Sequence, residues 1–301
     1  MSLINVIFLQ AFNGLSVGSI LLLAALGLAI TYGVMGVINM AHGQFIMIGG
    51  YVTFVVEGVF QKATGNADPN VSFVVALPLA FVVGACIGIV LEQTVVRHLY
   101  KRPLDTLLAT FGVGLVFQQL VKDIFGAPNV SVRAPAWLDG RILLAPGLVL
   151  PYARLFILGL SLFCLAAVYV YLYRSSRGRR IRAVIQNREI ADCLGVKTSA
   201  VDRETFALGT GLAALAGCAL CLIGPIGPFV GNDYIVDAFM VVITGGVGQL
   251  AGTVISAFLM GALNAVFTFV TTASLGRVFV FLAIIVFLQL RPGGLVSVKS
   301  R

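Results

Sequence analysis

The first apolar stretch of this chain covers residues 6–60 and reads VIFLQAFNGLSVGSILLLAALGLAITYGVMGVINMAHGQFIMIGGYVTFVVEGVF. Glu57 is the one Asp, Glu, Lys or Arg residue in it. A helix needs about 20 mainly apolar residues to cross the hydrocarbon core of a bilayer, so the stretch predicts two crossings, at residues 6–32 and 37–60. Residues 39–45, NMAHGQF, predict a glycine-containing break followed by an apolar helix.

The rest of the chain has the same composition. Over 301 residues it is 59% hydrophobic and 11% charged, with a mean hydropathy of +1.03, whereas soluble domains carry about 25% charged residues. A soluble enzyme is therefore excluded. Further apolar runs occupy residues 71–96, 104–121, 152–172, 206–223, 235–244, 251–269 and 278–290.

The run at 235–244 is too short for a comfortable crossing and is followed by Gly245 and Gly246. It predicts a short or broken helix, which lipid tolerates only where neighbouring protein satisfies the freed backbone groups. The fold class expected for residues 1–301 is therefore all-α. It is a single polytopic transmembrane domain, a helical bundle of about eight or nine spans with short broken helices.

Most basic residues fall between the apolar runs. Lys and Arg are concentrated in three links, at Arg97, Lys101 and Arg102, at residues 174–203, and at Arg291, Lys299 and Arg301. Because cytoplasmic links are enriched in Lys and Arg, these links are predicted to be cytoplasmic, with an external N-terminus. The orientation of the chain in a lipid membrane therefore explains the net charge of +8, and no nucleic-acid partner is expected.

Residues 174–204 carry the clearest signal outside the membrane. The part from 174 to 203 holds eight of the twenty basic residues and three acidic ones. Apolar residues interleave with the charges, and Gly195 offers a helix stop. We expect one or two short amphipathic helices that dock into a protein groove, the alternative being a basic helix on anionic lipid.

Motifs for chemistry are missing from the sequence. There is no G-x-x-x-x-G-K-[ST] loop, no H-E-x-x-H and no G-x-S-x-G, and His42 and His98 are the two histidines. The chain is therefore predicted not to be an enzyme, with no catalytic residue, no metal and no cofactor. The five cysteines predict no disulfide framework.

Polar residues inside apolar runs are costly in lipid and by default mark a pathway or a contact between helices. Asn39 and His42 lie three apart and are expected to share a helix face. A pathway lined by amides and hydroxyls suits a small neutral or zwitterionic solute, which a transporter or a passive channel could carry. The structural alternative is that these side chains form hydrogen bonds between helices. The candidate pathway residues are Asn39, His42, Gln44, Asp237, Thr244, Gln249 and Asn264.

Several segments resemble one known family. They are ALGLAITYGVMGVINMAHGQFIMIGGY at 25–51, LEQTVVRHLYKRPLDTLLATFG at 91–112, RAVIQNREIADCLGV at 182–196, GGVGQLAGTVISAFLMG at 245–261 and LRPGGL at 290–295. They look like the permeases of branched-chain amino acid type ABC importers. Within that family, LLATFGVGLVFQQLVKDIFGAPNVSV at 107–132, PAWLDG at 135–140 and YIVDAFMVVITGGVGQ at 234–249 look most similar to the urea-type permease.

The resemblance implies a permease of the bacterial inner (cytoplasmic) membrane. Urea or short amides are the expected cargo, and branched-chain or other amino acids are the alternative cargo. A second alternative is that the chain is a passive facilitator channel for a small neutral solute. The implied partners are a paralogous second permease, two ATP-binding cassette ATPase subunits and a periplasmic solute-binding protein. The cytoplasmic coupling loop would be 174–204, with ATPase coupling by Asn187, Arg188, Glu189, Asp192, Leu194 and Gly195.

Overall fold

The computed structural model describes residues 3–64, 69–100, 102–145 and 148–296. Lys101, Lys299 and Arg301, which belong to the predicted basic links, lie outside these ranges. The longer helices are α1 (Leu3–Met35), α2 (His42–Thr64), α3 (Pro69–Leu91), α5 (Pro103–Phe125), α6 (Tyr152–Arg174), α7 (Ser176–Gln186), α9 (Thr198–Leu220), α10 (Val230–Gly245), α11 (Leu250–Val270) and α12 (Ala273–Leu290). The short ones are α8 (Arg188–Cys193), α4 (Arg97–Leu99), a π-helical stretch at Glu92–Val96 and a 3-10 turn at Ala136–Leu138.

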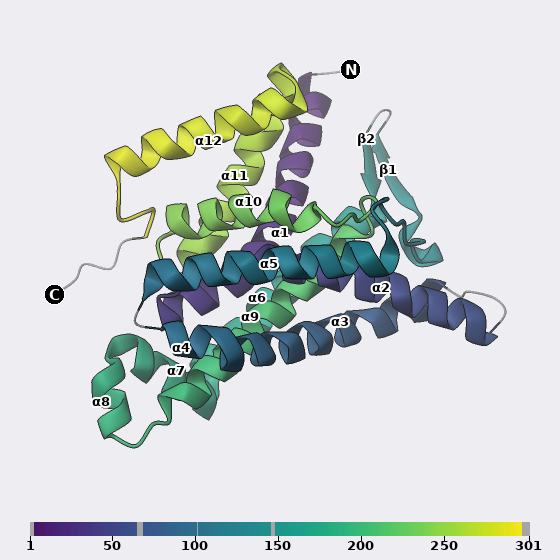
Figure 1. Cartoon of the computed structure of the whole chain (residues 1–301). Coiled ribbons are helices and arrows are strands. Elements are labelled where there is room, and N and C mark those ends of the chain that lie inside the picture. Colours follow the sequence, from purple (N-terminus) through teal and green to yellow (C-terminus); the bar gives the residue numbers. More distant parts are fainter. Residues whose placement is uncertain (1–2, 65–68, 101, 146–147, 297–301) are drawn as a thin grey trace.

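The expected helical fold class is confirmed, with one addition. Strands β1 (Arg141–Ala145) and β2 (Leu148–Pro151) form an antiparallel hairpin, with Arg141 opposite Pro151. The hairpin was not predicted, although a Pro-Gly dipeptide between two apolar runs is a turn signal. It lies at one end of the bundle, outside the apolar spans (Figure 1).

Seven helices of the described chain are long and apolar enough to cross a membrane. They are α1, α2, α3 with its continuation to Leu99, α5, α6, α11 and α12. Helix α9 has the length of a crossing, and α10 has 16 residues, about 24 Å at 1.5 Å per residue. The predicted count of eight or nine spans is reached by adding these two helices and is approximate.

Several predicted helix starts are wrong, and two of them lie beside polar residues of interest. The second span was expected from residue 37 but begins at His42, because Gly36 ends α1 with a φ of +64°. The sixth was expected from residue 206, but α9 begins at Thr198. Its polar first turns are helical because Val201, Asp202 and Thr205 are buried against the rest of the protein.

Helix α9 forms the centre of the bundle and packs against α1, α2 and α3. Small residues let the backbones approach closely, as is usual for helices in lipid. A methyl group at Gly217 would overlap the carbonyl oxygen of Ile46, and one at Gly27 would overlap that of Gly209. On α3, Gly84 and Gly88 lie against Ala214 and Thr210. The core is therefore specified by small side chains as much as by large ones.

We expect Gly217→Ala to lower the thermal stability of the protein, because its methyl group has no room beside Ile46. Overpacking of this kind costs about 1–3 kcal/mol. The measurement is the midpoint of thermal unfolding in detergent. Gly159→Ala on α6 is the matched control, since nothing lies within 4 Å of a methyl group there, and equal midpoints for the two variants would contradict this packing.

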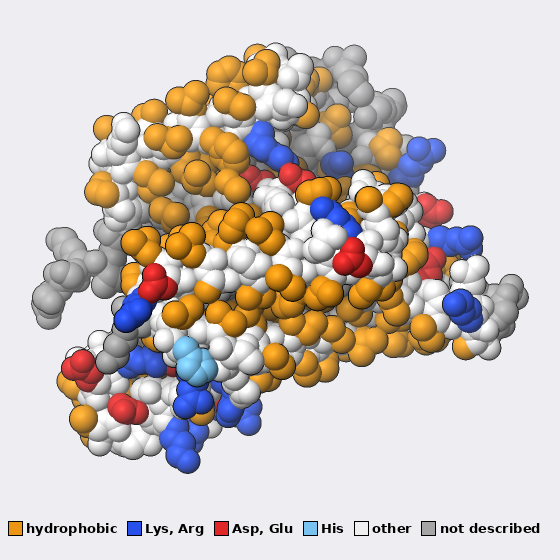
Figure 2. Space-filling model, viewed as in Figure 1, with side chains coloured by type: hydrophobic (Ala, Val, Ile, Leu, Met, Phe, Trp, Pro, Cys, Tyr) orange, Lys and Arg blue, Asp and Glu red, His pale blue; other side chains and the backbone are white. Residues whose placement is uncertain are grey.

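Charged side chains lie mainly at the two ends of the bundle. Hydrophobic side chains are spread over the face between the ends, and most basic side chains gather at the ends (Figure 2). At one end Tyr100 contacts both Arg188 and Asp202, so two of the basic links predicted to be cytoplasmic meet. Helices α7 and α8 project from this end, away from the hairpin (Figure 1).

Candidate functional site

The break between α1 and α2 is polar and buried. The Asn39 side chain, 1% exposed, accepts a hydrogen bond from the backbone N–H of Ala41 through Oδ1. The backbone N–H of Met40 donates to the Thr110 hydroxyl of α5 at 3.1 Å. These bonds replace helical ones that the break removes, which is the condition for non-helical backbone at membrane depth.

His42 and Gln44 begin α2 and point to different neighbours. His42 Nε2 lies 3.0 Å from the carbonyl oxygen of Ala24 on α1, and Gln44 Nε2 donates to Asn232 Oδ1 on α10 at 2.8 Å. The prediction that Asn39 and His42 share a helix face is wrong, because Asn39 precedes the first turn of α2.

Each of these three side chains keeps one buried polar atom without a hydrogen-bond partner among the described residues. The atoms are Asn39 Nδ2, His42 Nδ1 and Gln44 Oε1. Such atoms are uncommon in folded proteins. The break is therefore both a packing element and a source of free hydrogen-bonding groups.

Thr244 and Gln249 lie at a second break, between α10 and α11. Thr244 is 3% exposed, and its hydroxyl has no partner in the described chain. Its carbonyl oxygen accepts from the backbone N–H of Leu295 at 2.8 Å. Gly246 and Gly248 supply the positive φ angles of +100° and +76° that turn the chain there, and Gln249 is the residue before α11.

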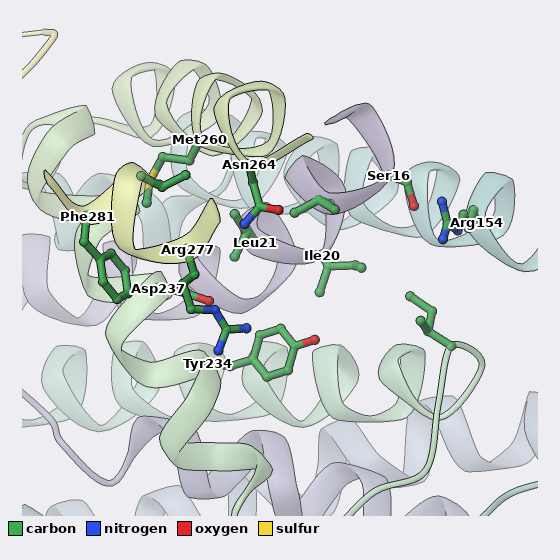
Figure 3. A pocket seen from close by; sticks show the side chains of 13 residues that line it. Ser16, Ile20, Leu21, Arg154, Tyr234, Asp237, Met260, Asn264, Arg277 and Phe281 are labelled. Carbon is green, nitrogen blue, oxygen red and sulfur yellow. The ribbon is translucent and has the colours of Figure 1, made fainter. Parts of the chain in front are cut away.

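Asp237 and Asn264 line a separate cavity of about 230 Å³ between α1, α6, α10, α11 and α12. We call it the charged cavity. Its polar lining consists of Ser16, Arg154, Tyr234, Asp237, Asn264 and Arg277. Figure 3 shows Arg277 beside Asp237 and Tyr234, with Asn264 facing the same space from α11. The structure thus divides the seven predicted pathway residues among three places.

Sequence reasoning missed Arg154, Tyr234 and Arg277 as parts of this cavity. Arg277 was left out because the apolar run was taken to start one residue later, yet α12 begins at Ala273. A basic residue within the first two turns of an apolar helix is a signal for a functional site. The Arg154 side chain is held by Asn13 Oδ1 at 2.7 Å.

Helix α8 has a capped end on each side. The Asn187 side chain accepts from the backbone N–H of Ile190 at 3.0 Å, which is the N-cap bond. At the other end Gly195 takes a φ of +82°, Gly195 N–H bonds Asp192 and Val196 N–H bonds Ala191, the pattern of a Schellman motif. A six-residue helix is marginal alone, so these caps help to define it.

Arg188 turns inward from α8 and attaches it to α9. Its guanidinium forms an ion pair with Asp202, whose side chain is 3% exposed, and lies 4.3 Å from the centre of the Tyr100 ring. Burial raises the pKa of Tyr100, and the Asp202 carboxylate raises it further, so the hydroxyl stays protonated and donates to Asp202 at 3.0 Å. Although burial opposes the charge on Arg188, its hydrogen bond to Asp202 raises the Arg188 pKa overall.

The remaining predicted coupling residues face outward. Glu189, Asp192, Leu194 and Gly195 are exposed, and Leu194 is 79% exposed. Ile190, four residues earlier on α8, is a second exposed apolar side chain. An outward face with charged and large apolar groups is suited to a protein partner.

Comparison with known proteins identifies relatives over nearly the whole chain. Residues 10–288 match the family described as "Branched-chain amino acid transport system / permease component". The high-affinity branched-chain amino acid transport system permease protein BraD of Pseudomonas aeruginosa is 27% identical over 96% of this chain and 95% of its own. LivH of Escherichia coli, a protein with the same description, is 27% identical over 96% and 94%.

A more distant relative carries a different description. The inner membrane ABC transporter permease protein YjfF of Escherichia coli is 25% identical over 87% of this chain and 79% of its own. No solved structure matches the chain significantly.

Proposed function

We propose, from the premise that this chain belongs to the family of branched-chain amino acid transport permease components, that it carries a branched-chain or related amino acid across the membrane. The chain is a multi-pass membrane protein and a transport subunit, not an enzyme. The match across residues 10–288 carries the proposal. It includes both helix breaks, the charged cavity and α8.

An amino acid replaces urea as the proposed cargo. The expectation of urea or short amides has no support in the comparisons, because BraD and LivH are named for branched-chain amino acids. The segments that suggested a urea-type permease lie mainly in α5 and α10. Helices that pack in the same way in different permeases do not by themselves report the cargo.

The proposed assembly is an ABC importer in the bacterial inner membrane. Two ATPase subunits dock at the end of the bundle that carries α8, which faces the cytoplasm, and a second permease completes the pathway. An external solute-binding protein delivers the amino acid at the other end. This arrangement is supported by the basic links that meet beside α8 and by the relatives' description as transport-system permeases.

The test is uptake of radiolabelled L-leucine and urea by proteoliposomes that contain the complete transporter. We expect leucine to accumulate when ATP and the loaded binding protein are both present, and neither solute to accumulate without them. The control is the same complex with an ATPase variant that cannot hydrolyse ATP. ATP-driven uptake of urea but not leucine would overturn the cargo, and flux through this chain alone would indicate a passive facilitator.

A further inference from the structure

The charged cavity holds two opposite charges that do not pair with one another. Asp237 lies on α10 and Arg277 on α12, and both line the cavity. Their charges act on each other through space, but they form no ion pair within 4.0 Å and no hydrogen bond with any described residue. Ionised side chains inside apolar spans are expensive unless they find a partner.

We propose that the charged cavity binds the head group of the transported amino acid, with Asp237 facing the ammonium group and Arg277 the carboxylate. The inference rests on the function proposed above and names the residues that would bind the transported amino acid. A zwitterion pairs both side chains at once. It carries no net charge, so its entry leaves the total charge of the cavity unchanged.

The geometry assigns the carboxylate to Arg277 rather than to Arg154. The Arg154 guanidinium already donates to Asn13 Oδ1, whereas no described residue accepts from Arg277. Figure 3 places Tyr234 beside Arg277 and directs its ring toward the same space. A guanidinium matches a carboxylate with two parallel hydrogen bonds, which fixes orientation as well as charge.

The rest of the lining suits an aliphatic side chain. Its apolar part consists of Val17, Ile20, Leu21, Met260, Val280 and Phe281. A volume of about 230 Å³ is many times the space that one water molecule needs, so the cavity can hold a small solute. Urea has no charged groups and no apolar part, so it would form no ion pair with Asp237 or Arg277 and would leave the apolar lining unused.

The experiment compares Asp237→Asn, Arg277→Gln and the double variant in the complete transporter. Leucine uptake is measured with the binding protein saturated, next to the ATP hydrolysis that the loaded binding protein stimulates. We expect each single variant to lower the maximal uptake rate at least about tenfold, since contacts to charged groups are among the strongest hydrogen bonds. Stimulated ATP hydrolysis should stay near the wild-type rate, because docking of the partners is unchanged.

Matched controls are Asp233→Asn, one turn before Asp237 and exposed, and Arg141→Gln, an exposed residue of the hairpin. Neither lines the cavity, so both should transport normally. The double variant separates recognition from a structural role. If the two charges only balance each other, removing both restores uptake; if they bind the head group, uptake stays as low as in the worse single variant.

Restored uptake in the double variant would overturn the inference, and so would normal uptake in both single variants. Either result leaves leucine transport by the wild-type complex intact, so the proposed function would survive. Failure of the wild-type complex to transport leucine at all would instead overturn the function on which the inference rests. Protein amounts in the membrane, measured for each variant, distinguish lost transport from lost folding.

Discussion

Leu194→Asp is expected to abolish ATP-driven uptake while the permease remains inserted and folded. Leu194 follows α8 with 79% of its surface exposed, so the folded chain does not need it for packing. Burying a leucine against a partner contributes about 1.5–3 kcal/mol, and an aspartate at the same place must be desolvated without a partner. Each 1.4 kcal/mol weakens binding about tenfold, so the ATPases should dissociate.

The measurement is co-purification of the ATPase subunits with the tagged permease, together with leucine uptake. Ile142→Asp serves as the control, because Ile142 is also exposed but lies on β1 of the hairpin, outside the apolar spans. We expect the control to keep its ATPases. Retention of the ATPases by Leu194→Asp would remove α8 from the proposed docking surface.

Asp202→Ala should uncouple ATP hydrolysis from transport by freeing α8 from α9. Asp202 accepts hydrogen bonds from both Arg188 and Tyr100. Removing it leaves the partly buried Arg188 guanidinium without its acceptor, at a cost of about 1.5–3 kcal/mol for bonds to a charged group. Helix α8 has few other contacts with the bundle, so force applied to it would no longer reach α9. The readout is leucine transported per ATP hydrolysed.

Two further variants test this reading of Asp202. Glu204→Ala removes a neighbouring acid whose ion pair with Arg177, at 3.9 Å, is well exposed, and pairs of that kind are worth about 0–1 kcal/mol. We expect little effect from it. The exchange of Arg188→Asp with Asp202→Arg should recover part of the coupling by restoring an ion pair. Full coupling in Asp202→Ala alone would show that the pair does not transmit force.

The local features of this protein could be predicted from its sequence. Apolar runs located seven crossing helices, because transfer into lipid depends on the composition of each segment by itself. The end of α8 beside Gly195 was also predicted correctly, because a helix cap involves residues only a few positions apart.

Features that depend on distant residues could not be predicted in this way. Arg188 was expected to face the ATPases, whereas it binds Asp202 on another helix. Residues up to 204 were assigned to the cytoplasmic coupling loop, yet α9 begins at Thr198 and its Asp202 is buried. The hydropathy of a segment does not tell which of its faces meets protein and which meets lipid.

The sequence by itself therefore determined that this chain is a helical membrane bundle with two glycine-containing breaks and a basic, capped segment outside lipid. The tertiary structure decided which polar groups meet. Asp237 and Arg277 share a cavity although α11 separates them in the chain, while Asn39 and His42, only three residues apart, face different neighbours. The physical reason is that helix formation is set by neighbours in the chain, whereas the pairing of charges is set by packing between helices.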